Sequence, residues 1–274
     1  TFTRKNGETT ESVIVTKAKE TTIPRNGGAN LGAFFTYEIK NAEELLAWNK
    51  AAAKWTDWDF VTLNSDTGVI DCSEIDSDDW TVRNFSGILD GNNQTIDNLV
   101  IEKNGAASFL GRATGYAVIK NLTFGAGCSF TVTGTTGADG MNQFAKNRTY
   151  AASVLSEASE HTCLINITNN GTITATAGSA TNGNYFAGIC ASHDGLEAIN
   201  GCKNYGSVTV LGTPSCWTNI SGVFGQITKQ VTATGCENHG DVQFKGTNSN
   251  NVTAYGLWHH NIRLNNVAAF TASA

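Results

Sequence analysis

The string "NGCKNYGSVTV" occupies residues 200–210, and a similar string, "TGCENHGDVQF", follows 34 residues later at 234–244. Cys, Asn and Gly keep their places in both copies, so that Cys202 and Asn204 are matched by Cys236 and Asn238. A repeat of this length without intervening helices cannot bury an apolar face alone, so neighbouring repeats have to stack. The two strings therefore predict a fold built from stacked units.

The repeat extends across most of the chain. From residue 85 onward a short apolar segment recurs with a small residue at its centre, and apolar side chains stand two positions before and after that residue. Because side chains alternate along a strand, these flanking residues share one face, which we expect to point inward. We predict that the central glycines lie on one line along the stack: Gly87, Gly111, Gly188, Gly222 and Gly256, with Ser153 taking this place in one unit.

The repeated strings predict further columns. Cys202 and Cys236 would share an inward column with Ile167. Stacked asparagine side chains can hydrogen-bond along the axis, and the predicted ladder consists of Asn169, Asn204 and Asn238. The chain must then turn, and we expect a positive φ at the glycines that follow, Gly171, Gly206 and Gly240.

The composition is that of an all-β protein. Of 274 residues, 40% are hydrophobic, 29 are Gly and 2 are Pro, and Thr and Asn are abundant. Short strands in a ~34-residue repeat favour a parallel β-helix of about six coils, roughly 30 Å tall. A β-propeller is the alternative, but its blades need roughly 40–45 residues. The interval of 24 residues between Gly87 and Gly111 cannot hold such a blade.

One amphipathic helix is predicted ahead of the repeats, in "NAEELLAWNKAAAKW" at residues 41–55. Asn41 and Glu44 have the spacing of a capping box, and the apolar face consists of Leu45, Trp48, Ala52 and Trp55. Such a helix would cover the open end of the strand stack. We therefore predict a short N-terminal β segment (1–40), a capping helix with lead-in strands (41–84) and the β-helix repeats (85–274), the last two forming one continuous domain.

Charge and cysteine usage exclude several classes of partner. The net charge is −6, and no run of Lys or Arg could follow a phosphate backbone, so we expect no nucleic acid. No apolar segment approaches the ~20 residues of a membrane-spanning helix. The seven cysteines show no C-x-x-C spacing, which argues against a zinc site and favours buried thiols.

Two phrases, "FSGILDGNNQTIDNLVI" (85–101) and "FLGRATGYAVIKNLTF" (109–124), carry a resemblance to a known family. Together with the later C-x-N-x-G-x-V units, they resemble the secreted or surface β-helix proteins of Bacteroides-type gut bacteria, and the later coils are similar to GLUG-type repeats of adhesins. The resemblance covers about residues 36–258. It implies a right-handed β-helix of the pectin-lyase-like superfold, exported to the surface of a Gram-negative cell and held there by a lipid anchor upstream of this chain.

Binding residues are predicted on the outer surface. An outward column of Asn170, Tyr205 and His239 could hydrogen-bond and stack with a sugar, and the alternative is an ordinary polar and aromatic surface. Trp217 lies in the polar connection "GTPSCWTN" and is the best candidate for an exposed tryptophan. Lys203 and Glu237 would be neighbours in adjacent coils, which predicts an ion pair.

No constellation of catalytic or metal-binding residues emerges. The outward positions beside the small central residues contain one charge, Arg112, and no acid pair. The acidic stretch "DCSEIDSDDW" (71–80) lacks the Gly and the closing Glu of a calcium loop, so we expect a solvated loop. His259 and His260 are adjacent and would point to opposite sides of a strand. We therefore predict no catalytic residue, no metal and no cofactor.

The sequence thus favours a non-catalytic, extracellular or cell-surface β-helix protein. Its partner would be a glycan or a component of a host or cell surface, with a role in adhesion or glycan interaction. The alternative is a carbohydrate-active enzyme, a polysaccharide lyase or glycosidase of the same superfold. Residues 59–84 and 112–150 are not resolved by the repeat, and a catalytic site of such an enzyme would have to be assembled there.

Overall fold

The structure is a computed structural model that describes residues 2–6, 9–13, 34–51, 58–134, 148–159, 161–177, 183–193, 196–227, 231–247, 251–257 and 262–265. The chain divides into two compact units, Thr1–Gly32 and Ala33–Ala274. In the first unit, β1 (Phe2–Asn6) pairs antiparallel with β2 (Thr9–Val13). The remaining residues of the predicted N-terminal segment belong to the second unit, because β3 (Phe34–Ile39) pairs there with β4 (Trp58–Leu63).

The second unit consists of four stacked parallel sheets, and its described residues contain one α-helix, α1 (Ala42–Lys50), and one short 3-10 helix, η1 (Ser77–Asp79). The first sheet contains β3, β4, β5 (Val69–Asp71), β6 (Gly87–Asp97), β10 (Val118–Phe124), β14 (Thr162–Asn169), β18 (Leu196–Asn200), β19 (Lys203–Asn204), β23 (Val231–Thr234), β24 (Glu237–Asn238) and β27 (Ile262–Asn265). The second contains β7 (Val100–Asn104), β11 (Ser129–Gly134), β15 (Thr172–Ala177), β20 (Val208–Gly212) and β25 (Val242–Phe244). The third contains β8 (Ala106–Ala107), β12 (Thr149–Ala151), β16 (Asn184–Ala187), β21 (Thr218–Ser221) and β26 (Val252–Tyr255). The fourth contains β9 (Leu110–Ala113), β13 (Leu155–Ala158), β17 (Cys190–His193) and β22 (Phe224–Ile227).

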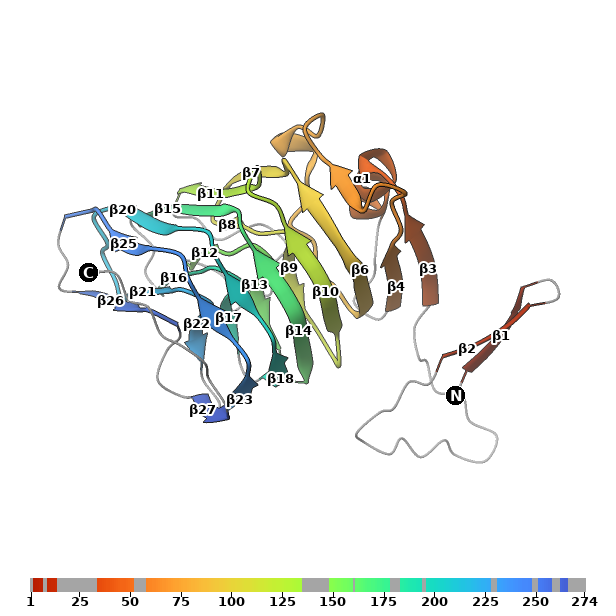
Figure 1. The fold of residues 1–274 in the computed structure, drawn as a ribbon. Helices are drawn as coiled ribbons and strands as arrows, with labels where there is room; N and C mark the ends of the chain where they lie inside the picture. The colour runs from red at the N-terminus through yellow and green to blue at the C-terminus, as the bar shows by residue number, and fades with distance from the viewer. Residues whose placement is uncertain are drawn as a thin grey trace, which may run out of the picture. The chain divides into compact units, whose positions relative to one another are not determined.

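The chain passes through the four sheets in a fixed order. It runs through β6, β7, β8 and β9, and then through β10, β11, β12 and β13, which lie directly beside them (Figure 1). One passage through the four sheets is a coil. Each coil pairs in parallel with the coil before it, as β14 does with β10. The all-β character and the parallel sheets are therefore as the sequence predicts, and the winding is consistent with a parallel β-helix.

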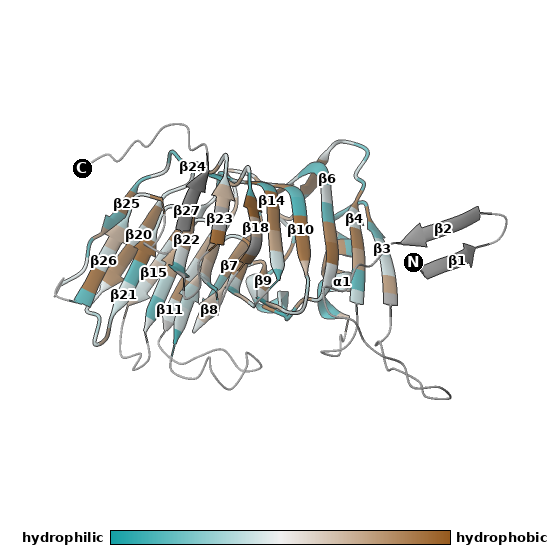
Figure 2. Ribbon diagram, turned by 90° about the horizontal axis from the view of Figure 1, so that it is seen from below, coloured by the Kyte–Doolittle hydropathy of each residue, from teal (hydrophilic) through white to brown (hydrophobic). Residues whose placement is uncertain are grey.

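Alternation along the strands places the apolar residues inside. In the first sheet the successive partners Leu89, Ile119, Leu164, Ile199 and Ala233 are all fully buried. Hydrophobic and hydrophilic residues alternate along the strands in Figure 2. A single continuous core thus runs along the stack, and burial of its apolar surface drives the coils together.

The predicted line of glycines is only partly present. Ala151, Phe186, Ile220 and Ala254 are successive partners, which aligns Ser153 with Gly188, Gly222 and Gly256. A Cβ on Gly188 would lie 2.2 Å from the carbonyl oxygen of Gly222, so the coils approach too closely here for a larger residue.

The prediction is wrong for Gly87 and Gly111. Leu110 pairs with Leu155, so Gly111 lies next to Ser156 and not next to Ser153. Gly87 pairs with Asp59 in the first sheet, at a different corner of the coil. The short apolar segment with a central small residue therefore occurs at more than one position of the coil. The first coils differ in length, so the sequence did not reveal this difference in position.

The glycines after the asparagines have a different role from the predicted one. Gly171, Gly206 and Gly240 do not have a positive φ; Asn121, Asn166, Gly201 and Gly235 do, with φ between 52° and 63°, and these four residues share one column. At Gly206, a Cβ would lie 1.8 Å from the carbonyl oxygen of Gly171. The prediction of a positive φ is therefore wrong. Glycine occurs at these positions because the neighbouring coil lies too close for a side chain.

A ladder of buried amides lies beside these glycines. The Nδ2 of Asn169 donates to the Oδ1 of Asn204 (2.8 Å), and the Nδ2 of Asn204 donates to the Oδ1 of Asn238 (2.8 Å). The same amide nitrogens also donate to the carbonyl oxygens of Gly171 (2.9 Å) and Gly206 (2.8 Å). The buried polar side chains thus satisfy both one another and the backbone, which is required of polar groups removed from water.

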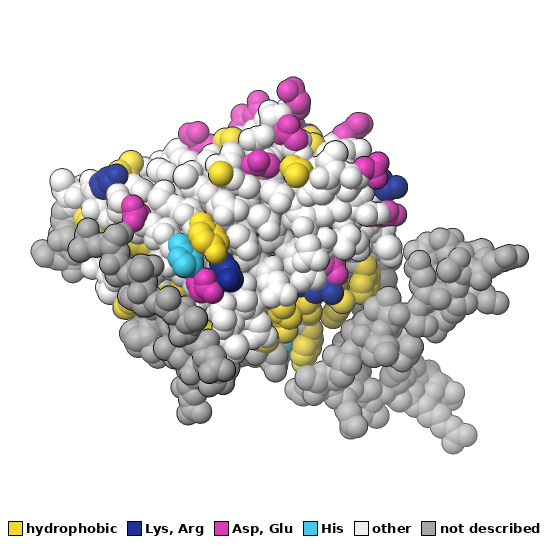
Figure 3. All heavy atoms as spheres, in the orientation of Figure 1, with side chains coloured by type: hydrophobic (Ala, Val, Ile, Leu, Met, Phe, Trp, Pro, Cys, Tyr) yellow, Lys and Arg dark blue, Asp and Glu magenta, His cyan; other side chains and the backbone are white. Residues whose placement is uncertain are grey.

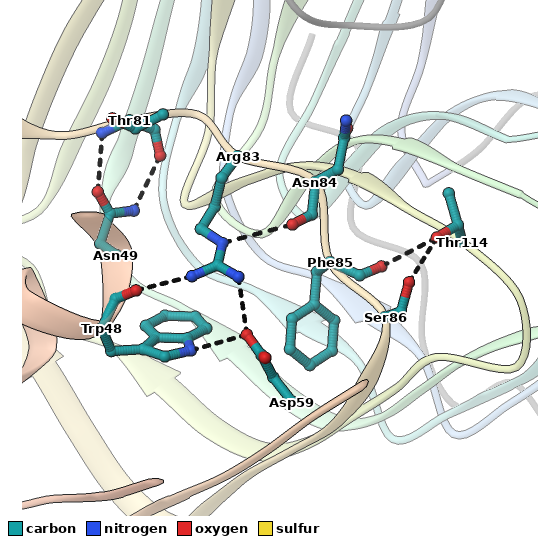
Figure 4. A network of polar contacts seen from close by, with 9 residues as sticks. All are labelled: Trp48, Asn49, Asp59, Thr81, Arg83, Asn84, Phe85, Ser86 and Thr114. Carbon is teal, nitrogen blue, oxygen red and sulfur yellow. Dashed lines mark hydrogen bonds and ion pairs between the residues drawn. The ribbon is translucent and has the colours of Figure 1, made fainter. Parts of the chain in front are cut away.

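The helix α1 is fixed by a buried ion pair (Figure 4). Asp59 accepts hydrogen bonds from the guanidinium of Arg83 (2.7 Å) and from the Nε1 of Trp48 (3.1 Å), while Arg83 also donates to the carbonyl oxygen of Trp48 (2.7 Å). The Asn41 side chain accepts from the backbone N–H of Glu44 (2.9 Å), as in a capping box. Ala52 and Trp55, predicted on the same helix face, lie outside the described residues.

We predict that Asn204→Ala lowers the free energy of unfolding by about 2–3 kcal/mol, because it leaves buried partners of the amide unsatisfied. Lys203→Ala is the matched control, since it alters the neighbouring, solvent-facing residue of the same strand and should cost roughly 0–1 kcal/mol. Urea unfolding followed by circular dichroism measures both. Equal losses in the two variants would contradict a stabilising role of the ladder.

Candidate functional site

Three of the predicted binding residues lie side by side on adjacent coils. The backbone N–H groups of Tyr205 and His239 donate to the carbonyl oxygens of Asn169 and Asn204, each at 2.7 Å. Asn170 precedes them in the same column, and its N–H donates to the carbonyl oxygen of Phe124 (2.9 Å). The rings of Tyr205 and His239 are nearly parallel (6°), with centroids 4.7 Å apart, and Tyr205 is 46% exposed.

The polar groups around this ring stack bind one another. Glu237 accepts from the Nζ of Lys203 (3.0 Å), as the sequence predicts, and its other oxygen lies 2.8 Å from the Nε2 of His239. Hydrogen bonds from His239 and Lys203 lower the pKa of Glu237. His239 covers one face of the Tyr205 ring. We call these four residues the Tyr205 patch and regard it as a largely self-satisfied surface.

Trp217 is not part of the Tyr205 patch and lies directly before β21, a strand of the third sheet. Thr149, Asn184 and Thr218 are successive partners, which aligns the residues before them, Arg148, Gly183 and Trp217. Trp217 is 57% exposed, and its indole Nε1 donates to the hydroxyl of Tyr185 (2.9 Å). A Cβ on Gly183 would lie 2.1 Å from that Nε1, so the indole lies across the space that the glycine leaves open.

A charged cluster adjoins Trp217, and the sequence analysis missed it. The Arg148 guanidinium carbon lies 5.8 Å from the ring centroid of Tyr185, and Tyr185 stacks on Tyr150 with centroids 5.6 Å apart. The Nε of Arg112 lies 3.4 Å from Glu157, and both side chains are largely buried (14% and 6% exposed). Coulombic interactions link Glu157 with Arg148 and Tyr150. We call these five residues the arginine–tyrosine cluster.

The cluster lies on the outer side of the third and fourth sheets. Ala151 and Phe186 belong to the main core, so Tyr150 and Tyr185, which precede them, face the other way and pack in a separate apolar group. Burial, followed by the negative charge of Glu157, raises the pKa of Tyr150, and burial raises the pKa of Tyr185. Both phenols therefore stay protonated and uncharged at neutral pH, and the Tyr185 hydroxyl accepts the indole N–H of Trp217.

The register explains why this cluster was missed. Sequence reasoning placed Arg112 beside Val154, because it aligned Gly111 with Ser153. In the structure Arg112 pairs with Glu157. Alignment of "LGRA" (110–113) with "LSEA" (155–158) would have brought the two opposite charges together.

The acidic stretch uses several of its carboxylates locally. Asp76 accepts from the backbone N–H of Asp78 (2.9 Å), and Asp79 pairs with Lys50. Acidic side chains gather mainly along the upper edge of the face drawn in Figure 3. Among the described residues, no group of three or more His, Cys, Asp or Glu side chains is arranged to hold a metal ion. His259 and His260 lie outside those residues.

None of the seven cysteines forms a disulfide, and five of them are buried. Burial raises the pKa of Cys72 to about 12 and that of Cys128 to about 11. These two thiols are therefore protonated at neutral pH and behave as apolar groups. Within the ranges that the structure describes, no helix has the length and apolar character of a membrane span.

Comparison with known proteins gives little. No family model matches the chain, and no curated protein matches it. One similar solved structure is described as that of "a putative immunoglobulin A1 protease from Bacteroides ovatus"; it is 16% identical, with 86% of this chain and 80% of that chain covered and a TM-score of 0.49. A likeness at this level says nothing about what this chain does.

We predict that His193 makes the fold less stable in acid. The side chain is fully buried, and burial lowers its pKa from 6.5 to about 3. Because the folded pKa is below the unfolded one, the full stability is present above pH ~6.5 and is lost as the pH falls towards the folded pKa, by about 2 kcal/mol at pH 5. Urea unfolding at pH 7.5 and 5 measures this loss. The variant His193→Gln should lose less stability between these pH values, and an unchanged pH dependence would contradict the assignment.

Proposed function

We propose that this chain is a right-handed parallel β-helix of about six coils, covered at one end by α1, that acts as a non-catalytic carbohydrate-binding protein outside the cell or at its surface. The proposal rests on the exposure of Trp217 to solvent. Its indole is exposed to solvent although its N–H group is held by Tyr185. An aromatic ring fixed in this way offers a flat apolar face to a ligand.

The fixed orientation of Trp217 favours binding. Tyr185 holds the indole nitrogen, and Gly183 leaves room for the ring, so little side-chain freedom remains to be lost when a ligand stacks on it. Aromatic side chains combine a large apolar area with few rotatable bonds, which suits them to the apolar face of a sugar ring.

The stacked scaffold supports the same proposal. The third sheet presents one side chain per coil at each outward position, so a glycan chain running along the stack would meet Arg148, Gly183 and Trp217 in turn. The resemblance to surface β-helix proteins of Bacteroides-type bacteria supports a location where host or cell-surface glycans would be the ligands. Adhesion is the corresponding biological role.

The alternative, a polysaccharide lyase or glycosidase, has less support. A glycosidase needs two carboxyl groups about 5–9.5 Å apart that can reach the substrate. Glu157 is the carboxylate of the arginine–tyrosine cluster, and it is largely buried and paired with Arg112. In residues 59–84, Asp59 is engaged by Arg83 and Trp48.

We predict that Trp217→Ala weakens glycan binding at least about 10-fold, which corresponds to a loss of roughly 1.4 kcal/mol. A glycan array identifies a ligand, and titration calorimetry then compares the wild type with the variant. Tyr205→Ala is the matched control, since it removes an exposed aromatic ring from the other surface and should change affinity less than about 2-fold.

Three results would contradict the proposal. Binding that is unchanged by Trp217→Ala would exclude this site, and the absence of binding to any glycan would exclude the function. Release of new reducing ends from a polysaccharide by the wild type would favour the enzyme. Thermal unfolding of both variants verifies that each remains folded.

A further inference from the structure

The neighbours of Trp217 indicate which glycans the site would accept. Arg148, Gly183 and Trp217 occupy the same position in three successive coils. At ~4.8 Å per coil, the backbones of Arg148 and Trp217 are about 10 Å apart. Gly183 contributes no side chain, and the Trp217 indole lies across it, so the indole nitrogen and the Arg148 guanidinium both lie against Tyr185.

Both side chains are held by the same tyrosine. Trp217 donates its indole N–H to the hydroxyl of Tyr185, and the guanidinium of Arg148 lies over the ring of Tyr185. Tyr185 itself is fully buried and stacks on Tyr150. The buried tyrosines therefore fix the relative positions of one aromatic and one cationic group before any ligand arrives.

The charges in this region favour an anion. Glu157 pairs with Arg112 and also interacts with Arg148, whose other neighbours include the two protonated phenols of Tyr150 and Tyr185. Two arginines and one glutamate give the arginine–tyrosine cluster a formal charge of +1, although the chain as a whole carries −6. A cation in such surroundings attracts a negatively charged ligand.

Hydrogen-bond donors are also available there. The Nε of Arg148 is buried and makes no well-aligned hydrogen bond within the described part of the chain, while the guanidinium interacts with the hydroxyl of Tyr150. A carboxylate only accepts hydrogen bonds and forms its strongest pairs with guanidinium groups. A small rotation of the partly exposed Arg148 side chain would direct its donors to such a group.

We infer that the Trp217 site binds an acidic glycan, whose sugar ring stacks on Trp217 and whose carboxylate pairs with Arg148. Hexuronic acids and sialic acids both carry this group. The inference rests on the proposed function and adds the class of ligand and the residue that selects it. Arg148 is thus a specificity-determining residue, and Trp217 supplies affinity for acidic and neutral sugars alike.

The test compares matched ligands by titration calorimetry. An oligogalacturonate and a sialylated lactose serve as the acidic probes, and a neutral galactose oligomer and lactose are their uncharged counterparts. We expect the wild type to bind at least one acidic probe about 10-fold more tightly than its counterpart, with the preference decreasing as salt is added. The two pairs distinguish uronic from sialic acid.

Variants identify the residue responsible. Arg148→Gln keeps a similar length and removes the charge, so it should abolish the preference for the acidic probe and leave the neutral one within about 2-fold. Arg148→Lys should retain part of the preference, because the charge remains without the bidentate geometry. Lys203→Gln, which removes a cation from the Tyr205 patch, should leave the preference unchanged.

The outcomes separate this inference from the proposed function. Equal affinity for acidic and neutral probes, or a preference that survives Arg148→Gln, would overturn the inference, and the proposed function would stand if Trp217→Ala still abolished binding. Failure of the wild type to bind any probe or any arrayed glycan would overturn both. Thermal unfolding of Arg148→Gln and Arg148→Lys verifies that the comparison is made between folded proteins.

Discussion

Each coil of this protein lies on the one before it through backbone hydrogen bonds between parallel strands, and this in-register contact determines which residues each position can hold. Residues separated by one repeat come into contact with their own equivalents. Asparagine is suited to such a position because its amide both donates and accepts, so Asn169, Asn204 and Asn238 can bond in series. Glycine is required wherever the backbones come closest, as at Gly206 and Gly222.

The same contact organises the outer surface. An outward side chain has its neighbours above and below, so function has to be sought in columns as well as along the chain. One column stacks Tyr205 on His239, and these groups largely satisfy one another together with Lys203 and Glu237. Another brings Arg148 and Trp217 to either side of Gly183. The second column leaves an exposed tryptophan beside a cation. We therefore assign ligand binding to the column of Trp217 and a structural role to the column of Tyr205.

Much of the fold was predictable because the later coils repeat regularly. Their spacing of 34 residues aligns Asn204 with Asn238 and Gly188 with Gly222 without ambiguity. The earlier coils vary in length, and alignment on a short phrase misplaced Gly87 and Gly111. That error concealed the pairing of Arg112 with Glu157, which depends on a one-residue irregularity between Ala107 and Leu110. Backbone conformations at Asn121 and Asn166 were also missed, since asparagine at a positive φ has no distinct signal in sequence.

The central claim, that coils stack as equivalent units, is tested most directly by removing one of them. Deletion of residues 203–236 joins Cys202 to Glu237 and removes one repeat of 34 residues, so Asn169 would meet Asn238 in the place of Asn204. The shortened chain should keep the β-type circular dichroism spectrum and a cooperative urea transition, whereas deletion of residues 220–236, about half a coil, should abolish both. Loss of the cooperative transition in the whole-coil deletion, to the same extent as in the half-coil deletion, would contradict the account.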